Sequence, residues 1–174
     1  MPTNLRAFLL AVLVVAACGL QPAAFAQPPS LNPRQAASVE KEVRAFMQVV
    51  AQGITQQGPS AWTKYFAETP AFFMAVDGHL VFPDRVAASA GIRQAAQQIK
   101  QIQLVWGADL RVDPLDPHLA VVASSWHEVQ QRSDGRRLDE SGFFTAVAEF
   151  HDRRWQFRNA HWSLAAPPPP AAQH

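Results

Sequence analysis

Cysteine is nearly absent from this sequence, since Cys18 is the only one among 174 residues. An internal disulfide framework is therefore excluded, and the fold has to depend on a hydrophobic core. Net charge is also small, with 15 Lys and Arg against 14 Asp and Glu. A nearly neutral chain has no broad basic surface for nucleic acid or anionic lipid, and we expect neither as a partner.

Recognisable cofactor motifs are missing as well. The sequence contains no glycine-rich phosphate loop, no dinucleotide fingerprint and no His, Cys or Asp spacing typical of a zinc site. Ser125 and Ser163 lie in ordinary predicted strands, whereas a nucleophilic serine usually needs a strained turn. We therefore expect a function that requires neither a metal ion nor a cofactor.

Long hydrophobic runs are confined to the N-terminus, where Arg6 precedes the apolar stretch Ala7–Ala17. This pattern predicts a signal peptide over residues 1–26, because a bilayer span needs about 20 apolar residues. Ala24–Ala26 fits the small-x-small cleavage pattern, whereas the segment ending at Cys18 resembles the lipobox of bacterial lipoproteins. We expect a periplasmic or secreted protein, or alternatively an envelope lipoprotein that meets the membrane only through Cys18.

The opposite end, residues 165–174, holds four consecutive prolines and no hydrophobic periodicity. It is predicted to be a disordered, extended tail. Residues 32–164 remain, which is roughly 130 residues and enough for one domain with one core. Loss of the signal peptide removes Arg6, one of the 15 basic residues, and leaves 14 basic against 14 acidic residues.

Helix signals come first in the predicted domain. Asn32 is a candidate N-cap before a proline, and apolar residues then recur at three- and four-residue steps until Gly58. A short helix, a hairpin around Asp77-Gly78 and a third helix over about 84–100 follow. The predicted strands are 101–115, 118–131, 141–150 and 154–164. Helices followed by an antiparallel meander indicate an α+β fold.

Three local stretches carry a family resemblance. They are AWTKYFAETPAFFMAVDG (61–78), SWHEV followed by SGFFTAV (125–147), and the pattern W-x-F-x-x-x-HWS (155–163). With the order of elements, they resemble the nuclear transport factor 2-like superfamily, and most closely its SnoaL-like branch. The resemblance implies a cone-shaped, curved antiparallel sheet wrapped around the N-terminal helices, with a pocket at one end. It leaves the activity open, because similar domains serve as isomerases, dehydratases, association modules or plain binding proteins.

Tight turns predict which strand residues share a face of the sheet. Two-residue turns at 134–135 and 152–153 would align Ser125, Phe144 and His161 in one row on the concave face. A bulge in either hairpin would exchange the two faces. The predicted pocket residues are Tyr65, Phe73, Ser125, His127, Phe144, Asn159, His161 and Ser163.

No carboxylate falls clearly inside this predicted pocket. Glu149 is expected on the outer face, and Glu128, Asp139 and Glu140 are expected at or beyond strand ends. Enzymes that resemble this fold usually carry out proton transfer with carboxylates, or with a Tyr/His set, inside the cone. We therefore favour an exported domain that binds a small apolar or aromatic molecule in an aromatic, histidine-lined pocket, without committed chemistry.

Two other functions stay open. The first is a cofactor-independent lyase or isomerase, in which His127 or His161 moves a proton and Tyr65 or Ser163 holds the developing oxyanion. Against it, histidines on strands are more often buried polar residues that neighbours or water satisfy. The second is a homodimeric association module with a vestigial pocket.

The same register places Trp126, Phe143 and Trp162 in one aromatic row on the outer face. Each such side chain covers about 150 to 250 Å², which is too much contiguous apolar surface to leave in water. The segment after Ser163 is a poor cover because its prolines supply little apolar bulk. We expect a homodimer with this row at its interface.

Overall fold

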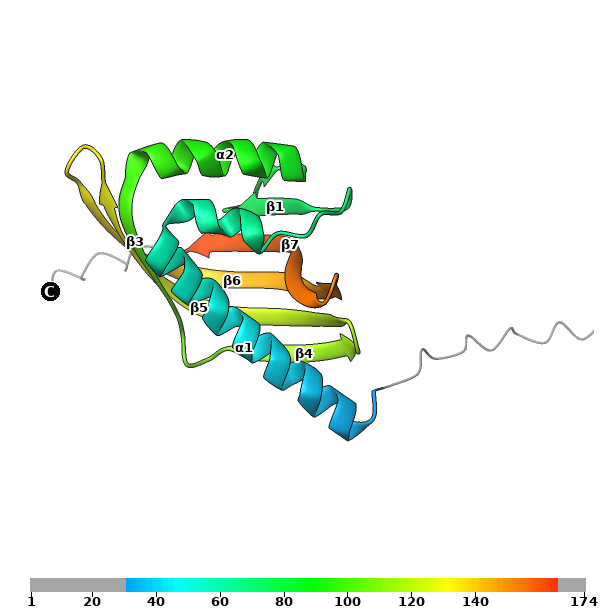
Figure 1. Cartoon of the computed structure of the whole chain (residues 1–174). Helices are drawn as coiled ribbons and strands as arrows, with labels where there is room; N and C mark the ends of the chain where they lie inside the picture. Colours follow the sequence, from blue (N-terminus) through cyan, green and yellow to red (C-terminus); the bar gives the residue numbers. More distant parts are fainter. Residues whose placement is uncertain (1–30, 166–174) are drawn as a thin grey trace, which may run out of the picture.

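The structure is a computed structural model that describes residues 31–165. The predicted signal peptide, the alternative at Cys18 and residues 166–174 of the predicted tail lie outside the described residues. Figure 1 shows α1 running diagonally across a curved sheet. The elements are α1 (Pro33–Gln57), the 3-10 helix η1 (Pro59–Lys64), β1 (Phe73–Val76), β2 (His79–Phe82), α2 (Arg85–Gln98), β3 (Ile99–Trp106), β4 (Arg111–Asp116), β5 (Leu119–Arg132), β6 (Arg137–His151) and β7 (Arg154–Leu164).

Helix α1 begins and ends at the predicted signals. The Asn32 side chain accepts hydrogen bonds from the backbone nitrogens of Arg34 and Gln35 at 3.1 and 3.0 Å, which satisfies donors that a helix start leaves open. Gly58, with φ of 75°, follows the last helical residue. One face of the helix is buried, through Val39, Val43, Phe46, Met47, Val50 and Ile54. None of the helices within residues 31–165 is long and apolar enough to cross a membrane.

The seven strands form one sheet in the order β2-β1-β7-β6-β5-β3, and β4 also pairs with β5. β1 and β7 run parallel, and the other paired strands are antiparallel. Two strands share one edge of β5, because β4 pairs with residues 119–123 and β3 with residues 126–132. The predicted α+β class is confirmed, with a mixed and mostly antiparallel sheet.

The inner face of the sheet is the one that packs on α1. Trp106 identifies it, because its Nε1 donates a hydrogen bond to the Met47 carbonyl of α1 at 2.8 Å. Trp126 lies opposite Trp106 on the neighbouring strand and therefore shares this face. The first four inner residues of β5 are buried, namely Ala120, Val122, Ser124 and Trp126. The other side of the sheet is called the outer face below.

Two of the three predicted two-residue turns are confirmed. Asp77 and Gly78 have φ values of 48° and 80° between β1 and β2, and Asp152 and Arg153 have 50° and 62° between β6 and β7. Positive φ at both positions is the geometry that suits the twist of a hairpin. Asp77 also accepts a hydrogen bond from the Leu164 backbone nitrogen at 2.8 Å, which ties this turn to the end of β7.

The predicted register between β5 and β6 is wrong, because their connection has three residues and not two. Arg132 N donates to Arg136 O at 2.8 Å, and Gly135 has φ of 88° within the loop 133–135. The added residue moves every pair by one position. His127 therefore lies opposite Ser141, where Gly142 was predicted.

The register between β6 and β7 is as predicted near the turn and shifted beyond it. Phe150 lies opposite Trp155 as expected, but the register shifts between Val147 and Ala148. This irregularity adds one residue to β7, as a β-bulge does. Phe144 is therefore opposite Trp162, where His161 was predicted.

Candidate functional site

Most of the predicted pocket residues lie on the outer face. Ser125 is opposite Phe143, and Phe143 is opposite Ser163, so these three side chains project to the same side. The residues found there are Phe73, Ser125, His127, Asn159, His161 and Ser163. Both histidines thus share one face as predicted, but it is the face away from α1. The three-residue loop and the shifted register together produce this correction.

A shallow cavity of about 470 Å³ on the outer face contains part of this set. Ser125, His127 and Ser163 line it. His127 Nε2 lies 2.7 Å from Asp139 Oδ1, and this hydrogen bond holds the pKa of Asp139 below its usual value. Asp109 accepts hydrogen bonds from the hydroxyl and backbone nitrogen of Ser125, which lower the pKa of Asp109. The His127 and Asp139 side chains are 53% and 51% exposed, so their pairing adds little to stability.

Tyr65 and Phe144 have structural positions. The Tyr65 hydroxyl donates to the Val49 carbonyl of α1 at 3.3 Å, over a helix surface left open by Gly53. Burial raises the pKa of Tyr65. Phe144 is fully buried in the core between the sheet and α1. Neither residue lines the inner cavity described next.

The predicted outer row of Trp126, Phe143 and Trp162 is also wrong. The rings of Trp126 and Trp162 meet edge to face on the inner side, with centroids 5.1 Å apart. Trp126 is only 6% exposed, whereas Phe143 is 43% exposed on the outer face. These tryptophans belong to the interior of the protein, so they cannot form the proposed dimer interface.

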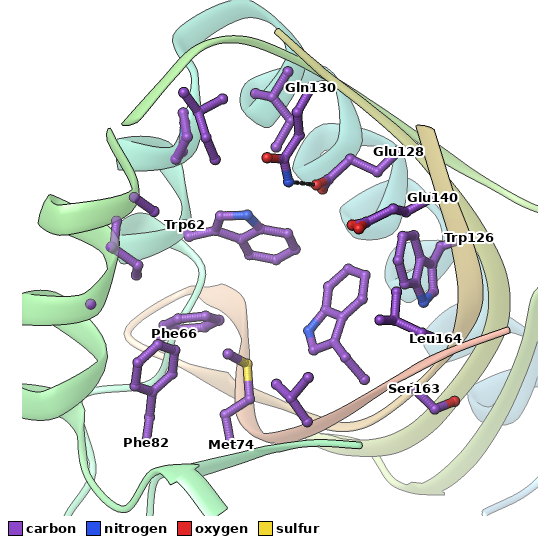
Figure 2. A pocket seen from close by; sticks show the side chains of 18 residues that line it. Trp62, Phe66, Met74, Phe82, Trp126, Glu128, Gln130, Glu140, Ser163 and Leu164 are labelled. Atoms are coloured by element: carbon purple, nitrogen blue, oxygen red, sulfur yellow. Dashed lines mark hydrogen bonds between the residues drawn. The ribbon is translucent and has the colours of Figure 1, made fainter. Parts of the chain in front are cut away.

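The inner cavity has a volume of about 400 Å³ and lies between η1, α2 and the inner face of the sheet. Figure 2 shows Trp62, Phe66, Phe82 and Met74 on one side of it and Trp126 and Leu164 on the other. Its remaining apolar lining comes mainly from small and aliphatic side chains of α2 and β3. The aromatic cluster expected for the pocket is therefore present, but with other members than those predicted.

Close packing of α2 on β2 shapes one wall of the cavity. Phe82 lies against Gly91 of α2, where any added Cβ would overlap the Phe82 ring. Glycine at this position thus lets the aromatic ring lie flat beside the helix, despite the usual cost of glycine within a helix. On the opposite wall, Trp162 lies between two other tryptophans. The centroid of its ring is 5.5 Å from that of Trp62 and 5.1 Å from that of Trp126.

Two carboxylates point into this apolar cavity. Glu128 of β5 lies directly opposite Glu140 of β6, and Figure 2 shows both side chains directed inward. Burial is the main cause that raises the pKa of Glu128, and the negative charge of Glu140 raises it further. Gln130 donates a hydrogen bond to Glu128, which opposes these two effects in part.

The sequence prediction missed Glu128 and Glu140 because it placed them at or beyond strand ends. On β6 the strand begins at Arg137, before Glu140, whereas on β5 Glu128 shares the face of Trp126, which the predicted register placed outside. One signal in the sequence could have found Glu128. A tryptophan ring gains more from burial than a histidine ring, so Trp126 is the better inner residue, and Glu128 lies two residues further along the same face.

The cavity combines a large aromatic surface with negative charge. Among the described residues 31–165, no Lys, Arg or His side chain lines it, and its other polar lining residues are Gln130 and Ser163. Ser163 contributes little polarity, because its hydroxyl donates to the Phe143 carbonyl at 3.3 Å. Within residues 31–165, no three His, Cys, Asp or Glu side chains are grouped as a metal ion would require. The arrangement suits an apolar ligand that donates a proton to the carboxylates or carries a positive charge close to them.

By sequence, the chain matches no protein-family model and no curated protein. By structure, it is similar to a nuclear transport factor 2-like superfamily protein from Salmonella enterica, with a TM-score of 0.66 at 15% identity, covering 79% of this chain and 99% of that one. A proposed dehydratase of the same family from Streptomyces avermitilis has a TM-score of 0.64 at 13% identity, covering 75% and 99%. A protein of unknown function from Shewanella oneidensis has a TM-score of 0.55 at 14% identity, covering 71% and 97%.

These likenesses show the fold. The chain has the nuclear transport factor 2-like fold, as the residue patterns predicted. The SnoaL-like branch is a finer assignment and stays a prediction. The structurally similar proteins include a proposed dehydratase and a protein without a known function, so the fold does not determine the activity.

Proposed function

We propose that this nuclear transport factor 2-like domain binds a small, mostly apolar molecule in the inner cavity. The observation that supports this most directly is the cavity itself, with about 400 Å³ lined by tryptophan and phenylalanine side chains. Small-molecule sites commonly have volumes of about 300 to 1,000 Å³, apolar walls and a few convergent polar groups. Glu128, Glu140 and Gln130 would supply those polar groups.

A matched pair of helix variants tests this proposal. Ala95 lines the cavity from α2, whereas Ala90 on the same helix is exposed. Ala95→Leu should fill part of the cavity and weaken binding of the neutral dye N-phenyl-1-naphthylamine by about tenfold, a loss of about 1.4 kcal/mol. Ala90→Leu should leave the dissociation constant unchanged. Equal binding by both variants would remove the cavity as the site.

A second candidate function is a cofactor-independent lyase or isomerase. The specific observation in its favour is Glu128, because a largely buried carboxyl group with a raised pKa suits general acid or base chemistry. His127 and His161 no longer support this alternative, since they lie on the outer face. Turnover that Glu128→Gln abolishes, while dye binding persists, would establish this function over simple binding.

Export is part of the proposal as well. The apolar run before Ala17 and the cleavage pattern at Ala24–Ala26 support a periplasmic or secreted protein, with lipidation at Cys18 as the alternative. Mass measurement of the protein from its own cells distinguishes a start at Gln27 from a lipidated start at Cys18. A cytoplasmic protein that retains Met1 would contradict export. The same preparation, measured by native mass spectrometry, would reveal a co-purifying ligand.

Homodimerisation also stays a proposal, although it requires an interface other than the predicted aromatic row. On the outer face, Val105 and Phe143 are 48% and 43% exposed around the shallow cavity. Their apolar surface would be covered if two copies met through this face. Sedimentation at micromolar concentration should show a dimer that Phe143→Lys converts to monomers. A wild-type monomer would remove the dimer from the proposal.

A further inference from the structure

We propose that the inner cavity selects small organic cations, meaning protonated amines or quaternary ammonium groups carried on an apolar body. This inference rests on the proposed binding function and names the class of its ligand. Three features of the cavity support it: its carboxylates, a lining that takes no cationic side chain from the part of the chain that the structure describes, and the arrangement of its tryptophans.

Within residues 31–165, the lining of the cavity offers the carboxylates Glu128 and Glu140 no basic partner. The nearby Arg132 is engaged elsewhere, because its guanidinium donates to Gln130 Oε1 at 3.1 Å and to Gln98 Oε1 at 2.7 Å. Gln130 in turn donates to Glu128, so the arginine reaches this carboxylate only through an amide. Two acidic groups that share an apolar site without a counter-charge favour a ligand that brings one.

The other surroundings of Glu128 are uncharged. On β3, the residue opposite Glu128 is Leu104. η1 contributes Trp62 to the cavity and α2 contributes Ile92 and Ala95, while Glu140 is the charged neighbour from β6. A neutral ligand would desolvate both carboxylates without compensation, and an anionic ligand would add repulsion.

The tryptophans offer aromatic surface in several orientations. Trp162 lies at 88° to Trp62 and at 72° to Trp126, so the three indoles form walls that face different directions. Indole faces attract cations, most strongly in desolvated sites, and ammonium-binding sites commonly surround the cation with such walls. The cavity thus offers an ammonium group both cation–π contact with the indoles and charge attraction to the two carboxylates.

Proton linkage gives the inference a second measurable consequence. Burial and the charge of Glu140 raise the pKa of Glu128, so part of the protein carries a proton on this group at mildly acidic pH. A bound cation favours the ionised carboxylate and would displace that proton. Cation affinity should therefore increase as pH rises through the raised pKa, whereas the affinity for a neutral ligand should not.

Two probes of the same shape test the inference on the purified wild-type protein. Benzyltrimethylammonium carries a positive nitrogen, and neopentylbenzene has carbon in its place. Quenching of tryptophan fluorescence reports binding, because Trp62, Trp126 and Trp162 line the cavity. We expect the cation to bind at least about tenfold more tightly near neutral pH, and this preference to shrink towards about pH 4.5.

Three variants assign the preference to the carboxylates. Glu128→Gln and Glu140→Gln each remove one negative charge from the cavity and should each reduce the preference for the cation. Asp113→Asn is the matched control, because Asp113 is an exposed acid on β4 outside the cavity lining. It should leave the preference unchanged.

Failure of the inference and failure of the proposed function give different results. Equal binding of the two probes by the wild type would overturn cation selection and leave the binding function standing. A preference that persists in both glutamine variants would overturn the role of the carboxylates. If neither probe nor N-phenyl-1-naphthylamine binds the wild type, both the inference and the proposed function are wrong. The wild-type comparison needs no variant, so it remains decisive if a glutamine variant fails to fold.

Discussion

Glu128 and Glu140 face each other across the β5–β6 pair, and both side chains point into the aromatic cavity. The three-residue loop 133–135 sets the register that places the two glutamates opposite each other. Placing two partly buried acids side by side in an apolar cavity costs stability unless a proton or a counter-charge is present. We propose that ligand recognition by the two carboxylates offsets this cost.

The pair predicts how stability changes with pH. The pKa of Glu128 is raised in the folded protein, so the folded state holds its proton more tightly than the unfolded chain does. The stability contribution is fully present below the ordinary glutamate pKa and is lost as pH rises through the raised value. Glu128→Gln removes this titration, so the variant should be more stable than the wild type above that range.

Urea unfolding at a series of pH values measures the effect. The difference between Glu128→Gln and wild type should be small in acid and should grow as pH rises. Asp113→Asn serves again as the control, because it lies outside the cavity and should not show this trend. A constant difference across the whole series would mean that Glu128 does not carry a raised pKa.

Local signals in the sequence were sufficient for the helix ends and for two of the turns. Asn32 and Gly58 bound α1 as predicted, and Asp77-Gly78 forms the predicted turn. Each of these features depends on a few neighbouring residues whose preferences are strong. The same is true of the apolar spacing that buries one face of α1.

The positions of the candidate site residues depended on register, which the local signals did not determine. Ser133, Asp134 and Gly135 are compatible with a two-residue or a three-residue connection, and the difference moves every later pair. Burial decides between them. The three-residue loop brings Trp126 into the core and leaves His127 half exposed, and an apolar ring gains more from burial than an imidazole does.

The observed register leads to a prediction about Trp126 and Phe143, which it places on opposite faces of the sheet. Trp126 is buried on the inner face and Phe143 is 43% exposed on the outer face. Trp126→Ala should cost about 3 to 5 kcal/mol of unfolding free energy, because it leaves a cavity in the core. Phe143→Ala should cost under about 1 kcal/mol, as substitutions at partly exposed positions usually do.

Thermal and urea unfolding of the two variants at low protein concentration give the comparison. Low concentration matters because a dimer through the outer face would add its own stability to Phe143. Similar losses for both variants in the monomer would contradict the assignment of these residues to opposite faces. Retention of full stability by Trp126→Ala would contradict it more directly.

The contact between α1 and Tyr65 provides the last prediction. Gly53 lies within a helix, where alanine would ordinarily be favoured by about 1 kcal/mol. A Cβ at this position would overlap the Tyr65 hydroxyl, which donates to the Val49 carbonyl one turn earlier. The overlap should outweigh the helix preference, so Gly53→Ala should destabilise the protein by about 1 to 3 kcal/mol.

Tyr65→Phe should partly rescue that variant. Without the hydroxyl, the nearest ring atom lies 3.0 Å from the added Cβ, a tight contact that a small shift of the ring relieves. Tyr65→Phe alone should cost about 1 kcal/mol through the lost hydrogen bond. The double variant should therefore be more stable than the sum of the two single losses predicts, by a coupling energy of about 1 kcal/mol or more. A double-mutant cycle by urea unfolding measures this coupling, and strictly additive losses would show that Gly53 and Tyr65 are not in contact.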